Sequence, residues 1–458
     1  MFDPTSLFVS LAIVVPGLIL AIQRSSLLVD YLFVVVAFNR LVRRYVDYQN
    51  GYFNPYSLIS ITPMVIGGLS VLVVLLELSR SSETFSKSTL KAIRWYGFAI
   101  ALAFTVGFIN TRFGAVYSLG DYIAPIGLLG FGALYARDEV IQRRWCATVV
   151  ICGTLVATYG LWQFYVIPPW DAFWVRAVSF EGYLGTLEST KMTLFSTMAD
   201  RGPCAIFLCS CIIVAILRPN SLGAVRYLAA IVMLAAMLLT YSRTTVVQLS
   251  VALAVYPLIN RGAGFSTVAL AALLSLFFGE TFISGLPGSG MASQRVSTLT
   301  DVASDGSFLG RLAILRGAAA ESLTEPLGLG IGSHGLSMKV AGSGSEFGLG
   351  DSTGYVETLR TFGWIGTPIV VGVFVLLWIS SHAVVKAGVK DVTVYVFRAW
   401  FISGLLAAFS GNWAFCATFF WVLGGYCLEQ SEELASKQED LDEYDTLGWE
   451  YENVKLQQ

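Results

Sequence analysis

Charged side chains are scarce in this sequence, and Arg243 is the one whose position most clearly points to chemistry. It is the only charged residue between Arg226 and Arg261. A charge within such an apolar stretch is costly and marks a functional site by default. A guanidinium suits phosphate, because it donates two parallel hydrogen bonds and stays protonated. We expect Arg243 at a tight turn between two apolar helices, either as an anion ligand or as an arginine whose head reaches the membrane surface.

Two further arginines fall in a stretch with helical character, residues 307–323. Arg311 and Arg316 are five residues apart, so they point about 140° apart on a helix and cannot grip one small group from the same face. One can face a ligand while the other pairs with Asp305 or Glu321. The alternative is a solvated amphipathic helix at the protein surface.

Three glycines follow this stretch, at positions 328, 330 and 332. Because they come after a helix and not after a strand, the dinucleotide-binding fingerprint is excluded. The spacing predicts instead a glycine-rich turn that ends the helix.

Two residues farther along are candidate bases. Asp351 precedes an apolar stretch and can accept the proton of a sugar hydroxyl, or it can simply cap the next helix. His334 can act as a general base, or it can be an incidental loop histidine. Tyr355 lies close to Asp351 in the sequence and is a candidate for contact with a sugar.

A shorter polar segment, residues 168–201, is rich in aromatic side chains. These rings can stack on sugars or form an aromatic belt at a membrane interface. Gln163 precedes the segment and Arg201 ends it, and both are candidate substrate ligands. Arg176 and Lys191 add positive charge to the same segment.

Apolar helices must position these residues. The chain has 458 residues, of which 55% are hydrophobic and 13% charged, whereas soluble domains carry about 25% charged residues. Since one span needs about 20 apolar residues, we expect an all-α polytopic membrane protein with about 12 transmembrane helices and a large periplasmic loop that contains short helices. The apolar runs lie near residues 6–22, 27–43, 56–78, 94–112, 117–136, 145–167, 202–218, 224–241, 244–260, 265–283, 361–385 and 395–428.

Lysine and arginine in the short connections set the expected orientation. Calling the connections with basic clusters cytoplasmic places two longer loops, 168–201 and 284–360, outside the cytoplasm. Arg40, Arg43 and Arg44 are exceptions, because they fall on the opposite side. The basic clusters lie at residues 80–94, 137–144, 218–226, 261 and 386–390.

Residues 1–428 are expected to form a single transmembrane domain. From Glu429 to the end the sequence is strongly acidic, with Lys437 and Lys455 as its only basic residues. This composition predicts a disordered tail, residues 429–458, on the cytoplasmic side.

The composition also argues against several functions. The formal net charge is -2, whereas nucleic-acid binding needs a basic excess that neutralises phosphates. The seven cysteines lie in apolar stretches without a C-x-x-C pair, so we expect buried thiols. With only two histidines in the chain, no metal centre is expected, and no cofactor is predicted.

The order of these features resembles the O-antigen polymerase and O-antigen ligase superfamily of bacterial envelope enzymes. The resemblance covers roughly residues 90–428. The matching motifs are Gln163-Phe164-Tyr165, Phe195 to Pro203, Tyr241-Ser242-Arg243, Asp305-Gly306-Ser307 with Arg311, Pro326 to Gly330, and Asp351 to Gly366.

Members of this superfamily are multi-spanning glycosyltransferases. The resemblance implies polymerisation or ligation of undecaprenyl-pyrophosphate-linked oligosaccharide units, without a metal, at the periplasmic face of the bacterial inner membrane. It implies as partners a lipid-linked glycan donor, a glycan acceptor, membrane lipid and other polysaccharide-assembly proteins. It also implies Arg243 and Arg311 as ligands of the donor pyrophosphate, with Arg316 and Arg201 as weaker ones.

One departure from the superfamily pattern favours a polysaccharide polymerase, or an exopolysaccharide-type member, over a lipid-A-core ligase. Ligases place a histidine just before the span that closes the large loop, whereas this sequence has Asp351-Ser352-Thr353-Gly354 there. The resemblance then leaves Asp351 as the first choice for the base and His334 as the second.

Two other classes stay open as alternatives. A secondary transporter also has about 12 spans, often with internal pseudo-symmetry and helices broken near the midplane. A flippase for lipid-linked sugars needs a cationic cavity across the membrane. A polar groove at the outer leaflet would favour the enzyme.

Overall fold

The part of the protein that the structure describes is almost entirely helical. The computed structural model describes residues 3–80, 84–135, 137–178, 184–218, 222–260, 306–333, 353–408 and 418–456. Within these residues, the extended pairing is limited to an isolated bridge between Gly185 and Met192. The expected all-α fold is therefore confirmed.

Apolar runs of the sequence become helices, because intrahelical hydrogen bonds satisfy the backbone where water is absent. A short 3-10 helix, η1 (Leu58–Ile61), leads directly into α3. The α-helices are α1 (Pro4–Ile22), α2 (Leu27–Asn50), α3 (Thr62–Arg80), α4 (Lys87–Thr111), α5 (Phe113–Tyr135), α6 (Glu139–Val166), α7 (Pro169–Ala177), α8 (Arg201–Leu217), α9 (Val225–Leu238), α10 (Arg243–Ile259), α13 (Gly306–Thr324), α15 (Gly354–Lys386), α16 (Val392–Ala407) and α18 (Thr418–Leu456).

Five helices among the described residues are long and apolar enough to cross a membrane: α1, α3 with η1, α4, α6 and α15. Four more, α8, α9, α10 and α16, are apolar but have only 14 to 17 residues. α2 has 24 residues, but arginines and an aspartate occupy its second half. The expected count of about 12 spans is therefore not confirmed, because these helices fall short in length or in apolar character. The apolar run 265–283 lies outside the described residues.

Side-chain contacts define one end of the helix assembly, which we call the basic end. Arg24 pairs with Glu77 at 2.7 Å, and Arg144 pairs with Asp30 at 2.9 Å. These ion pairs join the α1–α2 connection to the end of α3, and the start of α6 to the start of α2. Among the described residues, the basic clusters at 80–94, 137–144, 218–226 and 386–390 lie at this end of the helices.

Gln142, in the first turn of α6, brings two more helices to the basic end. Its side-chain oxygen accepts hydrogen bonds from Arg218, which follows α8, and from Thr393 in the first turn of α16. Polar side chains thus join the ends of α2, α3, α6, α8 and α16.

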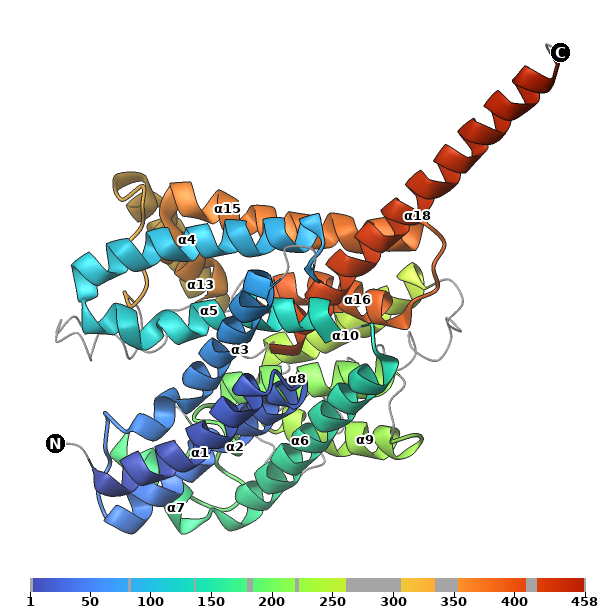
Figure 1. Cartoon of the computed structure of the whole chain (residues 1–458). Helices are drawn as coiled ribbons and strands as arrows, with labels where there is room; N and C mark the ends of the chain where they lie inside the picture. The colour runs from blue at the N-terminus through green and yellow to red at the C-terminus, as the bar shows by residue number, and fades with distance from the viewer. Residues whose placement is uncertain are drawn as a thin grey trace.

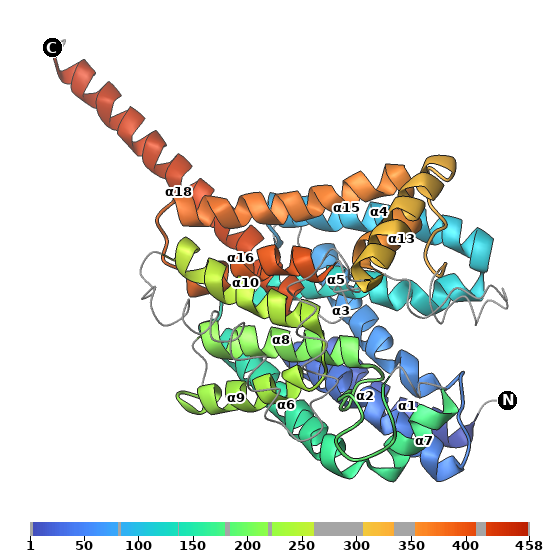
Figure 2. The ribbon, with the colours of Figure 1, turned by 180° about the vertical axis from the view of Figure 1, so that it is seen from behind.

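The opposite end, which we call the loop end, holds the longer connections. α15 begins there beside the end of α16, since Gly354 N donates to Ala408 O at 2.7 Å. α7, α13, the α4–α5 turn and the α9–α10 turn lie at this end as well. Figures 1 and 2 show α7 and α13 on the side away from the projecting part of α18.

α5 and α18 cross in close contact in the core. A Cβ at Gly132 would clash with the backbone of Val422, and one at Gly425 would clash with the backbone of Leu129. Only glycine permits such an approach, and small residues at helix crossings are common in membrane proteins. Phe420, beside this crossing, is fully buried.

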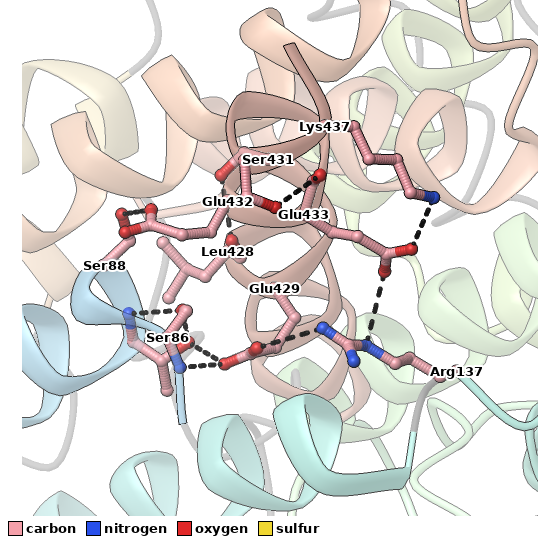
Figure 3. Close-up of polar contacts among 11 residues, drawn as sticks. Ser86, Ser88, Arg137, Leu428, Glu429, Ser431, Glu432, Glu433 and Lys437 are labelled. Atoms are coloured by element: carbon pink, nitrogen blue, oxygen red, sulfur yellow. Dashed lines mark hydrogen bonds and ion pairs between the residues drawn. The ribbon is translucent and has the colours of Figure 1, made fainter. Parts of the chain in front are cut away.

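Polar contacts dock the next turn of α18 at the basic end (Figure 3). Glu429 accepts hydrogen bonds from Ser86 N at 3.0 Å and from Thr89 Oγ1 at 2.7 Å. Its other carboxylate oxygen lies 3.6 Å from Arg137, just after α5. Glu429 therefore joins α18 to the start of α4 and the end of α5.

The acidic end of the chain continues α18 as a helix to Leu456, where the composition predicts disorder. The physical reason is that the helix starts inside the core and that hydrogen bonds stabilise its next turns. Ser88 Oγ donates to Glu432 at 2.7 Å, and Lys437 Nζ donates to Glu433 at 2.8 Å. A helix that is already nucleated by packing extends more easily than an isolated one. Figure 1 shows its last part projecting away from the other helices.

Two of the three arginines that break the expected charge rule lie inside the protein and not in a connection. Arg43 and Arg44, in the half of α2 toward the loop end, are 2% and 1% exposed. Arg43 lies 3.5 Å from Asp47 and donates to Asn54 O at 2.8 Å. The charge rule counts residues in short loops, so these buried and paired arginines carry no information on orientation.

Candidate functional site

An irregular segment lies buried at the loop end, shortly before α8. Residues 192–198, which we call the buried segment, form no helix and are all buried. Ser196 Oγ donates to Val156 O of α6 at 2.5 Å, and Thr197 Oγ1 donates to Ala37 O of α2 at 2.6 Å. Both acceptors lie well inside their helices, and irregular backbone at such depth needs partners within the protein.

Arg44 and Asp171 supply partners for the buried segment. The Arg44 guanidinium donates to Met198 O at 2.9 Å and to Ser196 O at 2.5 Å, and its Nε lies 3.2 Å from Asp171 Oδ1. Both side chains are fully buried. Burial raises the pKa of the Asp171 carboxyl, and the Arg44 charge counteracts this effect. The pair joins α2 to α7 and holds the buried segment in place.

Gln163, near the end of α6, completes this clamp. Its Oε1 accepts a hydrogen bond from Ser196 N at 2.8 Å, and its Nε2 donates to Asp171 Oδ2 at 2.5 Å. Tyr159 also donates to Asp171 Oδ2, at 2.8 Å. Gln163 is fully buried, and its amide binds the backbone of the buried segment. The sequence predicts instead that this side chain contacts substrate.

Arg201 and Arg243 begin α8 and α10, so both stand at helix N-termini at the loop end. Residues 239–242 form the tight turn that the sequence predicts before Arg243. The buried segment covers this turn, because Leu194 N donates to Leu239 O at 3.1 Å. Helix N-termini carry partial positive charge, so both positions favour a bound anion.

Arg201 and Arg243 lie at different distances from the loop end. α8 and α10 pack against each other, with Cys209 Sγ 3.7 Å from Thr245 O. Cys209 comes eight residues after Arg201, whereas Thr245 comes two residues after Arg243. At 1.5 Å per residue, Arg201 therefore lies about 9 Å farther toward the loop end than Arg243. Both side chains are half-buried.

α13 packs against α15 and carries the other two candidate arginines. Arg311 is half-buried, and Arg316 is exposed. Glu321, one of the two carboxylates expected to pair with these arginines, pairs instead with Arg360 of α15 at 2.8 Å, because α13 lies against α15. Asp305, the other expected partner, lies outside the described residues.

The glycine-rich turn after α13 is a strap, residues 325–333, that packs against α4. Its three glycines have φ angles of 73°, 81° and 89°, which glycine adopts without strain. Ile331 N donates to Ala103 O of α4 at 2.9 Å, and a Cβ at Gly330 would clash with the backbone of Gly107. The predicted turn is confirmed, and this close approach explains why the turn contains glycine.

Tyr355 lies in the first turn of α15, where its hydroxyl donates to Leu405 O of α16 at 2.5 Å. It is therefore at the loop end, as the sequence suggests. Asp351 and His334, the two candidate bases, lie outside the described residues. Within the residues that are described, no group of three His, Cys, Asp or Glu side chains could hold a metal ion.

A pocket of about 560 Å³ lies at the α4–α5 turn. The strap lies beside the pocket, because Asn110 Nδ2 donates to Leu329 O at 3.0 Å. Sequence reasoning missed Arg112 of this pocket, although it is the only charged residue between Arg94 and Asp121 and carries the same signal as Arg243. The pocket is lined by Phe108, Ile109, Arg112, Phe113 and Val116.

Polar side chains from α2, α5 and α15 form a second feature that sequence reasoning missed. Tyr122 of α5 donates to Glu357 of α15 at 2.7 Å. The charge of Asp121, also on α5, interacts with the charges of Glu357 and of Arg40 from α2. We call Arg40, Asp121, Tyr122 and Glu357 the α2–α5–α15 polar cluster. All four side chains are half-buried. Asp121 is the only charge in its apolar run, which by itself marks a functional candidate.

Comparison with known proteins adds no family to these observations. No protein-family model matches the chain, and no curated protein matches it. The side chains at the loop end therefore supply the evidence on function.

Proposed function

We propose that this protein is a membrane glycosyltransferase that polymerises or ligates undecaprenyl-pyrophosphate-linked oligosaccharide units in bacterial exopolysaccharide or O-antigen synthesis. The observation that carries the proposal is the pocket at the α4–α5 turn, which is lined by four apolar side chains and by one exposed arginine, Arg112. A lipid-linked diphosphate needs an apolar slot for its tail and a cation for its head, and this pocket offers both.

The surroundings of the pocket suit a lipid ligand. α4 is a candidate membrane span, so its outer surface meets lipid directly. Phe108 is 50% exposed and Phe113 is 77% exposed, which leaves their rings available to a hydrocarbon chain. Arg112 supplies the charge for a phosphate at the point where the chain turns.

The chemistry needs cations at the leaving group and a base at the acceptor. The bond between the anomeric carbon and the diphosphate oxygen breaks, and a new bond forms to the acceptor hydroxyl oxygen. Fixed guanidinium groups stabilise the charge that develops on the leaving diphosphate. Arg243, Arg201, Arg311 and Arg316 lie at the same end as Arg112 and are proposed for this role.

The proton of the acceptor hydroxyl must pass to a base. Asp351 is proposed first and His334 second. The α2–α5–α15 polar cluster adds two more candidate bases, Asp121 and Glu357, which are half-buried. Tyr355, in the first turn of α15, is proposed to contact the sugar.

The basic end faces the cytoplasm in this proposal, because lysine and arginine in short connections stay on that side. The loop end then faces the periplasm, where a diphosphate-linked glycan presents its sugars. The absence of a histidine before α15, at Asp351 to Gly354, favours a polymerase over a ligase.

The test is an assay with purified protein and an undecaprenyl-pyrophosphate-linked oligosaccharide. The proposal predicts longer lipid-linked chains, or transfer to a second glycan, without added metal. Arg112→Gln should lower product formation at least tenfold, whereas Arg143→Gln, an exposed arginine at the basic end, should match the wild type. If the wild-type protein yields no elongated or transferred glycan, the proposal is wrong.

One observation favours a transporter as a second candidate. The buried segment, a connection between α7 and α8, places irregular backbone beside the middle of α2 and α6, and transporters bind substrates where non-helical backbone lies near the middle of the membrane. A transporter or flippase of lipid-linked oligosaccharide would move the glycan across a vesicle membrane without changing its length, which separates it from the enzyme.

A further inference from the structure

Arg398 of α16 is a buried arginine that no carboxylate of the described residues neutralises. It is 8% exposed, and its Nε is buried without a hydrogen-bond partner. Within the part of the chain that the structure describes, the titratable side chain that interacts electrostatically with Arg398 is the thiol of Cys427. A protonated thiol offers no negative charge.

Two side chains of α15 position the Arg398 guanidinium. Nη1 lies 3.2 Å from His382 Nδ1, and the guanidinium carbon lies 4.3 Å from the centre of the Trp378 ring. Both partners are uncharged: a histidine nitrogen that accepts this hydrogen bond belongs to a neutral ring, and tryptophan contributes cation–π attraction. Nε has no hydrogen-bond partner among the described residues, so a donor of this guanidinium is left for a further ligand.

The contacts offset only part of the cost of burying this charge. A buried ion without a counter-ion is strongly unfavourable. One hydrogen bond to a neutral acceptor and one cation–π contact leave the positive charge uncompensated. An anion that binds the Nε–Nη2 edge would compensate it, and phosphate fits this edge through two parallel hydrogen bonds.

The position of Arg398 identifies the source of the anion. α15 is a candidate membrane span, and His382 is exposed four residues before its last residue, Lys386. At 1.5 Å per residue, His382 lies about 6 Å from the end of that helix, close to where a span meets lipid headgroups. Lys390, in the α15–α16 connection, adds positive charge at the same end. Basic sites between helices at this surface bind anionic lipid headgroups.

We infer that Arg398, with His382 and Trp378, binds the phosphate group of an anionic membrane lipid at the basic end. This site is independent of the proposed glycan chemistry, which takes place at the opposite end. Lipid binding would hold the α15–α16 pair together at the basic end.

The inference can be tested on the full-length protein in nanodiscs of phosphatidylcholine, with and without phosphatidylglycerol. Native mass spectrometry should show phosphatidylglycerol retained at least tenfold more by the wild type than by Arg398→Gln. The melting temperature of the wild type should rise when phosphatidylglycerol is present, and that of Arg398→Gln should not. Arg143→Gln removes an exposed charge at the same end and should behave like the wild type.

A second variant and a second ligand keep the outcome decisive. Arg398→Lys keeps the charge but loses the two-point contact, so it should fold and retain the lipid several-fold less well. Equal lipid retention by the wild type and Arg398→Lys, or a loss of stability in Arg398→Gln that is the same in both lipid mixtures, would overturn the inference. Inorganic phosphate that reproduces the whole stabilisation in phosphatidylcholine alone would overturn the assignment to lipid.

Discussion

Replacing Asp171 by alanine tests how the loop end is held together. The Asp171 carboxylate lies 3.2 Å from Arg44 Nε and accepts hydrogen bonds from Tyr159 and Gln163. Removing it leaves the Arg44 charge buried without its ion-pair partner. We expect the buried segment to lose its fixed position as a result.

The magnitude follows from these contacts. Breaking a buried ion pair by removing one partner costs about 3–5 kcal/mol. In an Arg44→Met background the carboxylate of Asp171 is itself a buried charge without an ion-pair partner. Removing it then relieves the cost of burying that charge but also removes the hydrogen bonds from Tyr159 and Gln163. Asp171→Ala should then cost about 1 kcal/mol or less. The coupling energy between the two positions should be about 3 kcal/mol, at the upper end for contacting residues.

The assay is equilibrium unfolding in mixed micelles with increasing SDS, followed by tryptophan fluorescence. Trp170 and Trp174 lie in α7 next to Asp171 and report on this region. The matched control is Glu188→Gln, which breaks an exposed pair with Lys191 in the same connection and should change the free energy of unfolding by less than about 1 kcal/mol. A measured coupling below about 0.5 kcal/mol would show that the two side chains act independently and would refute this reasoning.

Three other changes have defined outcomes. Gly330→Ala should release the strap from α4, because alanine is strained at this positive φ and its Cβ would meet the backbone of Gly107; limited proteolysis should show faster cleavage in residues 325–333. Arg137→Gln should loosen the docked turns of α18 by at most about 1 kcal/mol, because Arg137 is largely exposed; hydrogen exchange of α18 should rise slightly. Arg243→Lys should abolish polymer formation while the protein still inserts in the membrane, because lysine lacks the two-point contact with phosphate; an in vivo polymer assay with a membrane-fraction blot measures both.

These predictions have clear contradictions. Unchanged proteolysis of Gly330→Ala would mean that the strap does not depend on its glycines. Loss of all protection in α18 on replacing Arg137 would mean that the other contacts of Glu429 contribute nothing. Wild-type polymer yield in Arg243→Lys would remove Arg243 from the site.

The apolar pattern predicted the fold class, because a stretch of apolar residues in a membrane protein has helix as its simplest solution. It also predicted the tight turn before Arg243, and the spacing of the three glycines predicted the turn after α13. The number of spans did not follow, since the pattern cannot tell a span from a short apolar helix buried in the core. α8 shows this: 13 of its residues are buried, yet the helix has only 17 residues.

Long-range pairing explains the other differences. No sequence pattern indicates that Arg44 contacts Asp171, because the two residues lie far apart in the chain and only the packing of α2 against α7 brings them together. The same holds for Glu321, which pairs with Arg360 and not with an arginine of its own helix. Arg112 and Asp121 were different: each stands alone in an apolar run, so the rule that selected Arg243 applies to them equally.

The most direct test of the proposed function is to map where a lipid-linked diphosphate binds. An undecaprenyl-pyrophosphate analogue with a photoreactive group in its tail can be crosslinked to the purified protein, and the labelled peptides can be identified by mass spectrometry. We predict adducts at the α4–α5 turn, on Phe108 or Phe113, that unlabelled donor competes away and that Arg112→Gln reduces at least tenfold. Adducts confined to the basic end, or labelling that donor does not compete, would contradict the proposal.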